Sequence, residues 1–127
     1  MKNLTLDQIK GLAQQTASPS ISIFLPTHRA GRETQQDPIR FKNLLRDAEK
    51  QLLDGGMGPR EAGALLHSAQ ALLDDSNFWN HQHDGLAVFM SADDFHYYPL
   101  PFRVEELLVV AQSYYVKPVL PLFTNNG

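Results

Sequence analysis

The sequence predicts an α+β fold, with a small mixed or antiparallel sheet of about four strands packed against two or three helices. The first observation is periodicity. Longer segments repeat apolar residues at helical spacing, and shorter ones are rich in β-branched and aromatic residues. The second is the order of these segments: helix, strand, two helices and three strands. The third is size, because 127 residues with 43% apolar content suffice for one domain with one ordinary core.

The first two elements are a helix over residues 5–16 and a strand over 21–25. Thr5 and Gln8 have the spacing of a capping box, in which each side chain bonds to the backbone N–H of the other residue. The strand is short and β-rich, and Pro26 ends its ladder because proline has no N–H to donate. The apolar stripe of the helix consists of Leu6, Ile9, Leu12 and Ala13.

A polar loop, residues 27–36, leads into two helices. Asp37 is predicted at the N-cap of the first, with Pro38 at its first helical position. Residues 54–59 are rich in glycine and predict a turn, and the second helix is expected over 59–73. Helices joined this tightly should pack antiparallel. Their predicted core faces are Phe41, Leu44, Leu45, Ala48 and Leu52, and then Ala62, Leu65, Leu66, Ala69 and Leu72 or Leu73.

The C-terminal half predicts the remaining strands. A polar loop over 74–84 holds Phe78 and Trp79, whose rings are expected to cover an edge of the core. Residues 114–123 are apolar but interrupted by Pro118 and Pro121, which predicts a docking segment more than a regular element. The three predicted strands span 85–91 and 94–100, which form a hairpin, and 107–111.

Charge is distributed unevenly along the chain. Five of the eleven lysines and arginines fall between His28 and Arg46, against only two acidic residues. That window is about +3, whereas the rest of the chain is about −6. The total of −3 argues against a surface that coats nucleic acid, but it leaves room for a focused contact from one face. The basic window is therefore the candidate functional region.

The residues predicted to bind RNA or another anion come from the loop and from the charged face of the next helix. They are His28, Arg29, Arg32, Gln35, Gln36, Arg40, Lys42, Arg46 and Lys50. Lys42, Arg46 and Lys50 are four residues apart, and like charges at that spacing cost a few tenths of a kcal/mol per pair. This cost favours a functional role for these three cations. The alternative is a solvated loop whose arginines pair with the acidic surface, and the sequence favours neither.

No catalytic residue, cofactor or metal is predicted. A metal site could use His81, His83 and Asp84, with His96 as a fourth ligand, but no HExxH-type spacing supports it. A metal-dependent hydrolase is thus the least favoured alternative. The absence of cysteine excludes thiolate sites, and no apolar stretch is long enough to span a bilayer. Without a visible signal peptide, we expect a cytoplasmic protein with no membrane partner.

Three runs resemble a known family: ISIFLPTHRAGRETQQDPIRFKNLLRDAEKQL, FWNHQHDGLAVFMSADDFHYYPLPFRVEELLVV and KPVLPLF. They are similar to the N-terminal region of bacterial archaeo-eukaryotic release factor-like (baeRF) proteins, over roughly residues 21–123. Members of that group look like three-domain relatives of eukaryotic class-one release factors and of Pelota. The resemblance implies a release-factor N-domain-like fold and contact with ribosomal RNA, in translation termination, ribosome rescue or hibernation.

The resemblance does not extend to the motifs that read stop codons or release peptides. The sequence has no NIKS tetrapeptide, and Gly55-Gly56-Met57 does not replace the GGQ tripeptide, which belongs to a middle domain. We therefore expect a noncatalytic single domain over 1–127, the N-terminal fragment of a longer multidomain protein. Its expected partners are the ribosome or ribosomal RNA and its own C-terminal domains. The alternative function is a protein-interaction or intramolecular docking domain.

Overall fold

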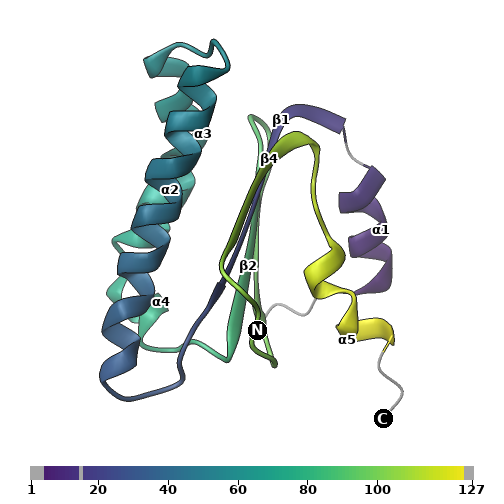
Figure 1. Ribbon diagram of the computed structural model, residues 1–127. Helices are drawn as coiled ribbons and strands as arrows, with labels where there is room; N and C mark the ends of the chain where they lie inside the picture. Colours follow the sequence, from purple (N-terminus) through teal and green to yellow (C-terminus); the bar gives the residue numbers. More distant parts are fainter. Residues whose placement is uncertain (1–4, 15, 125–127) are drawn as a thin grey trace.

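The computed structural model describes residues 5–14 and 16–124 (Figure 1), and it confirms the α+β class. Four antiparallel strands form one sheet in the order β3-β2-β1-β4, with helices on both faces. The elements are α1 (Leu6–Gln14), β1 (Thr16–Pro26), the 3₁₀ helix η1 (Arg32–Gln35), α2 (Gln36–Asp54), α3 (Pro59–Leu73), α4 (Ser76–Trp79), β2 (Gly85–Met90), β3 (Phe95–Leu100), β4 (Leu107–Ser113), the 3₁₀ helix η2 (Lys117–Val119) and α5 (Pro121–Thr124).

Strand β1 is the axis of the sheet because it pairs with β2 on one side and with β4 on the other. Its residue Ile21 lies opposite Met90 of β2 and Val110 of β4. Strand β1 is longer than the predicted 21–25, because residues 16–20 extend its start and Pro26 its end. Its pairing with β4 is irregular between Thr16 and Ser20.

One face of the sheet packs against the hairpin of α2 and α3, which stand side by side in Figure 1. Alternate residues of β1, namely Ile21, Ile23 and Leu25, point into this first core, as the two-residue period of a strand requires. The predicted core faces of both helices are buried here. Trp79 is buried too, and its Nε1 donates to the carbonyls of Leu72 at 3.0 Å and Leu73 at 3.1 Å. The prediction that Trp79 covers the core is confirmed.

The other face carries a second core, formed with α1 and the C-terminal segment. Phe24 of β1 lies edge to face with Phe89 of β2, with ring centroids 5.7 Å apart. Burial raises the pKa of Tyr98 and of Tyr114 above the ordinary 10.0, so both phenols stay neutral near pH 7 while their rings fill this core. Val119 of η2 is fully buried, so the C-terminal segment docks as predicted, although it forms the short helices η2 and α5 where no regular element was expected.

The capping box of α1 is confirmed. Thr5 N–H donates to Gln8 Oε1 at 2.9 Å, and Gln8 N–H donates to Thr5 Oγ1 at 3.2 Å. Helix α3 has the predicted bounds, and the hairpin of β2 and β3 lies within one residue of its predicted ends. Across residues 5–14 and 16–124, no helix combines the length and apolar character that a bilayer span needs.

Candidate anion and nucleic-acid interface

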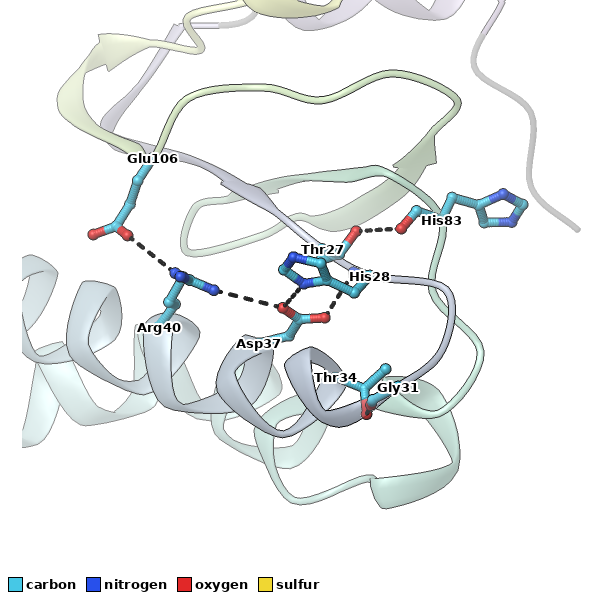
Figure 2. A network of polar contacts seen from close by, with 8 residues as sticks. All are labelled: Thr27, His28, Gly31, Thr34, Asp37, Arg40, His83 and Glu106. Carbon is cyan, nitrogen blue, oxygen red and sulfur yellow. Dashed lines mark hydrogen bonds and ion pairs between the residues drawn. The ribbon is translucent and has the colours of Figure 1, made fainter.

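The loop that leaves β1 is bonded to the segment that enters β2. Thr27 is buried, and its N–H donates to the carbonyl of Asp84 at 3.1 Å. Its hydroxyl donates to the carbonyl of His83 at 2.9 Å, a bond drawn in Figure 2. These two bonds hold the first residue of the loop against the sheet, so the position of the next residue, His28, is set by the fold.

Asp37 is fully buried and binds His28 twice (Figure 2). Its Oδ2 accepts the backbone N–H of His28 at 2.9 Å, and its Oδ1 lies 2.8 Å from the ring Nδ1. The prediction that Asp37 is the N-cap is wrong, because α2 begins at Gln36, two residues before the predicted start at Pro38, and Gln35 holds the cap position. Helix η1 runs directly into α2, and Gln36 N–H bonds to the carbonyl of Glu33. The Asp37 carboxylate is therefore free to fix the loop.

The contact with Asp37 sets the orientation of the imidazole. An ionised carboxylate only accepts, so Nδ1 of His28 must carry the hydrogen that it shares with Asp37. Nε2 makes no hydrogen bond with any described residue, and 27% of the side chain is exposed. Nε2 is an acceptor in the neutral ring and a donor in the protonated ring. His28 can thus meet either kind of polar group on a ligand.

Arg40 lies between two carboxylates (Figure 2). Its Nη1 is 3.8 Å from Asp37 Oδ1, and its Nε is 3.9 Å from Glu106 Oε1. Both distances exceed that of a hydrogen bond, so the attraction is electrostatic. Glu106 immediately precedes β4, and Arg40 therefore links α2 to the far edge of the sheet. Its charge is partly neutralised within the protein.

The other loop residues are more accessible. Arg29 donates from Nε to Asp84 Oδ1 at 3.0 Å, in a pair whose two side chains are 58% and 43% exposed. Arg32, Gln35 and Gln36 are exposed on η1 and at the start of α2. No ion pair of Arg32 is formed within the described part of the chain. An exposed pair such as Arg29–Asp84 contributes about 0–1 kcal/mol, so Arg29 is available to a stronger ligand.

Lys42, Arg46 and Lys50 form what we call the α2 stripe. All three side chains are exposed, and none makes an ion pair with a residue in the described ranges. At 3.6 residues per turn, neighbouring members lie about 6 Å apart along the axis and about 40° apart around it. Arg46 is in the middle, nearly opposite the core-facing residue Ala48. The three cations therefore share one outward-facing surface.

Two exposed aliphatic residues flank the α2 stripe. Ile39 precedes it and is 50% exposed, while Leu53 follows it and is 39% exposed. Both lie on the outward side of α2, at three or four residues from a member of the stripe. This combination of cations and aliphatic side chains was not anticipated from the sequence. The solvent-side helical spacing of 39, 42, 46, 50 and 53 was the signal that could have identified it.

Five of the nine predicted residues separate into two groups. His28 and Arg40 meet at the buried Asp37, whereas the α2 stripe lies on the open side of the helix. Sequence reasoning missed three carboxylates that bind the loop and helix: Asp37, Asp84 and Glu106. Only the three-residue spacing of Asp37 and Arg40 was visible in the sequence. The other two carboxylates come from distant segments.

The histidines proposed for a metal do not form a ligand set. His81 Nδ1 lies 2.8 Å from the carbonyl of Asn77, and His83 contributes its own carbonyl to the bond with Thr27. Both histidines line a hollow of about 400 Å³ beside Tyr97. No group of three or more candidate ligands comes together anywhere in residues 5–14 and 16–124.

No protein-family model matches the sequence, and no curated protein aligns with it significantly. The assignment of a function therefore depends on the side chains described above and on the resemblance of the quoted sequence runs.

Proposed function

We propose that this chain is a noncatalytic RNA-binding domain that contacts ribosomal RNA, as part of a release factor-like protein acting in termination, ribosome rescue or hibernation. The observation that carries the proposal is the α2 stripe, Lys42, Arg46 and Lys50, which is exposed and has no ion pair among the described residues. Cations that are not neutralised by the protein are the groups that bind phosphates and release counterions.

Within this proposal the two groups of residues have different roles. The α2 stripe and Arg32 make the phosphate contacts because they are exposed and unpaired. Arg29 and His28 contact RNA from the loop, since each keeps ring or guanidinium nitrogens that form no bond to the described residues. Arg40 acts as a positioning residue, which holds α2 against the carboxylates of Asp37 and Glu106.

The proposal is tested by neutralising the α2 stripe. The variant K42Q/R46Q/K50Q should bind purified bacterial ribosomes and a fluorescein-labelled single-stranded RNA more weakly than wild type. Loss of three phosphate contacts should reduce the slope of log K against log salt by about 2. Ribosome co-sedimentation and fluorescence anisotropy at several salt concentrations measure the two effects.

The matched control is K10Q/R60Q/K117Q, which changes the net charge equally but removes exposed cations from α1, α3 and η2. It should retain most of the affinity and the full salt slope. Equal losses of RNA affinity in the two variants would mean that binding depends only on the net charge of the protein. Undiminished ribosome binding by the stripe variant would refute the assignment.

A protein-docking function is the second candidate, and the exposure of Ile39 and Leu53 favours it. RNA phosphates gain nothing from aliphatic side chains, whereas a protein partner with an acidic rim buries them. The variant I39S/L53S separates the two functions. It should leave the affinity for the labelled RNA unchanged. If the α2 stripe docks onto a protein, such as a ribosomal protein or the chain's own C-terminal domains, the variant should weaken binding to that protein.

A further inference from the structure

Strand β4 is an edge strand without the protection that edge strands usually carry. It is the last strand of the sheet, and its outer side pairs with no other strand in the described part of the chain. Its sequence, LLVVAQS, contains no charge and no proline. The opposite edge, β3, contains Pro99, which cannot donate a hydrogen bond. Unpaired N–H and C=O groups along seven residues form a template for a further strand.

A groove runs between this edge and α2. It has a volume of about 450 Å³, and its apolar lining comes from Leu44, Leu107 and Leu108. Leu107 borders the groove at the edge of the sheet and is 37% exposed, although the pleat of the strand directs its side chain to the opposite face. A groove beside an unpaired edge can take the side chains of an added strand, while the backbone of that strand pairs with β4.

The polar lining of the groove is mostly acidic. The carboxylates are Asp47, Asp54 and Glu106, against the single cation Lys50. Glu106 is approached by Arg40 at 3.9 Å, but Asp47 and Asp54 make no ion pair with any described residue. The flank of α2 that faces β4 is therefore negative, although the outward side of the same helix carries the basic α2 stripe.

The pleat of β4 determines how an added strand would present its side chains. Leu108 and Val110 pack on the α2 side of the sheet, in the first core. Their neighbours Leu107 and Val109 point to the other side. Every second residue of an added strand would therefore lie next to α2 and its carboxylates. The residues between them would extend the apolar surface on the opposite face.

We propose that β4 binds an extended, basic peptide segment of another protein as a fifth strand of the sheet. The recognised segment alternates Lys or Arg with aliphatic residues, and its cations face Asp47 and Asp54. Pairing of β4 with a second copy of the chain is disfavoured because it would bring two sets of these carboxylates together. This site adjoins the proposed RNA contact at Lys50, which lines the groove, whereas Lys42 and Arg46 lie outside the groove on the outward side of α2.

The test uses two seven-residue peptides, KVKVKVK and EVEVEVE, labelled and blocked at their ends. KVKVKVK should bind the wild-type protein, whereas EVEVEVE should not. Binding of KVKVKVK should increase protection from hydrogen exchange only at the amides of β4. The variant D47N/D54N should weaken binding of KVKVKVK at least tenfold. Fluorescence anisotropy gives the affinities, and NMR-detected hydrogen exchange gives the location.

The matched control is D74N/D93N, which removes two exposed carboxylates remote from the groove and should bind like wild type. Equal binding by D47N/D54N, or protection outside β4, would overturn the proposal. If sedimentation instead reveals a dimer that Leu107→Lys abolishes, β4 pairs with a second copy of the chain and the peptide proposal is wrong. The variant K42Q/R46Q distinguishes the two proposals because neither residue lines the groove, so its peptide affinity should not fall when its RNA affinity does.

Discussion

Two groups of cations in the same basic window have opposite surroundings. Arg29 and Arg40 face carboxylates, whereas Lys42 and Arg46 face solvent with no ion pair to the described residues. The partners Asp84 and Glu106 lie outside the window, and together with Asp37 they pair with two of its five Lys and Arg residues in the folded protein. A charge count along the sequence therefore overstates the free charge of the loop. Besides Arg32 on η1, which makes no ion pair with a described residue, the free charge lies on α2 and continues to Lys50.

This comparison predicts that the contacts around Asp37 and Arg40 affect stability, whereas the exposed cations of the α2 stripe affect binding. The largest expected effect is that of Asp37→Ala, which removes the buried carboxylate that binds His28 and faces Arg40. The free energy of unfolding should fall by about 3 kcal/mol, because two charge-assisted bonds are lost and buried donors are left unpaired. Urea unfolding measures it. Asp47→Ala, an exposed position on the same helix, is the control and should change stability by less than about 0.5 kcal/mol.

The backbone of the loop is the next point to test. Gly31 has φ 91° and ψ −175°, a region that only glycine occupies readily, and an added Cβ would lie 3.0 Å from Glu33 Oε1. Gly31→Ala should therefore destabilise the protein by about 2 kcal/mol. The same substitution at Gly63, inside α3 with open space around it, should instead stabilise by about 0.5–1 kcal/mol. Thermal unfolding should show a lower melting temperature for Gly31→Ala and a higher one for Gly63→Ala. Changes in the same direction would contradict backbone strain at Gly31.

A smaller effect is expected where the paired group reaches the surface. Glu106→Gln removes the charge that faces Arg40 at 3.9 Å, and the pair is partly exposed. The expected loss is about 0.5 kcal/mol, and it should shrink in high salt. Glu105→Gln, at the neighbouring exposed position, is the control. Salt-dependent unfolding distinguishes the two variants, and identical behaviour would mean that Arg40 gains nothing from Glu106.

The smallest effect on stability is expected from the α2 stripe itself. The free energy of unfolding of K42Q/R46Q/K50Q should lie within about 0.5 kcal/mol of the wild-type value. A small increase is expected, because the variant removes repulsion between like charges four residues apart. Its RNA affinity should fall all the same. A large destabilisation would show that the α2 stripe is part of the fold, and the contrast between the two groups would then disappear.

Most of the local structure was predictable. The capping box of Thr5 and Gln8, the bounds of α3 and the core face of α2 follow from spacing over three or four residues, which one helix fixes by itself. The assignment of Asp37 as the N-cap was wrong because a second local signal, the 3₁₀ turn η1, extended the helix backwards. Strand β1 was underestimated because its pairing with β4, a segment about ninety residues away, stabilises its first residues.

The sequence alone determined which residues form helices and strands, which of their faces are apolar, and where cations concentrate, since these depend on neighbours within a few positions. The tertiary structure alone decided which cations remain free and which strand is left at an edge. Those outcomes depend on Asp84 and Glu106 reaching the loop and helix from distant segments, and on β1 taking the centre of the sheet. Contacts between distant segments exist only after the chain has folded, so no local pattern encodes them.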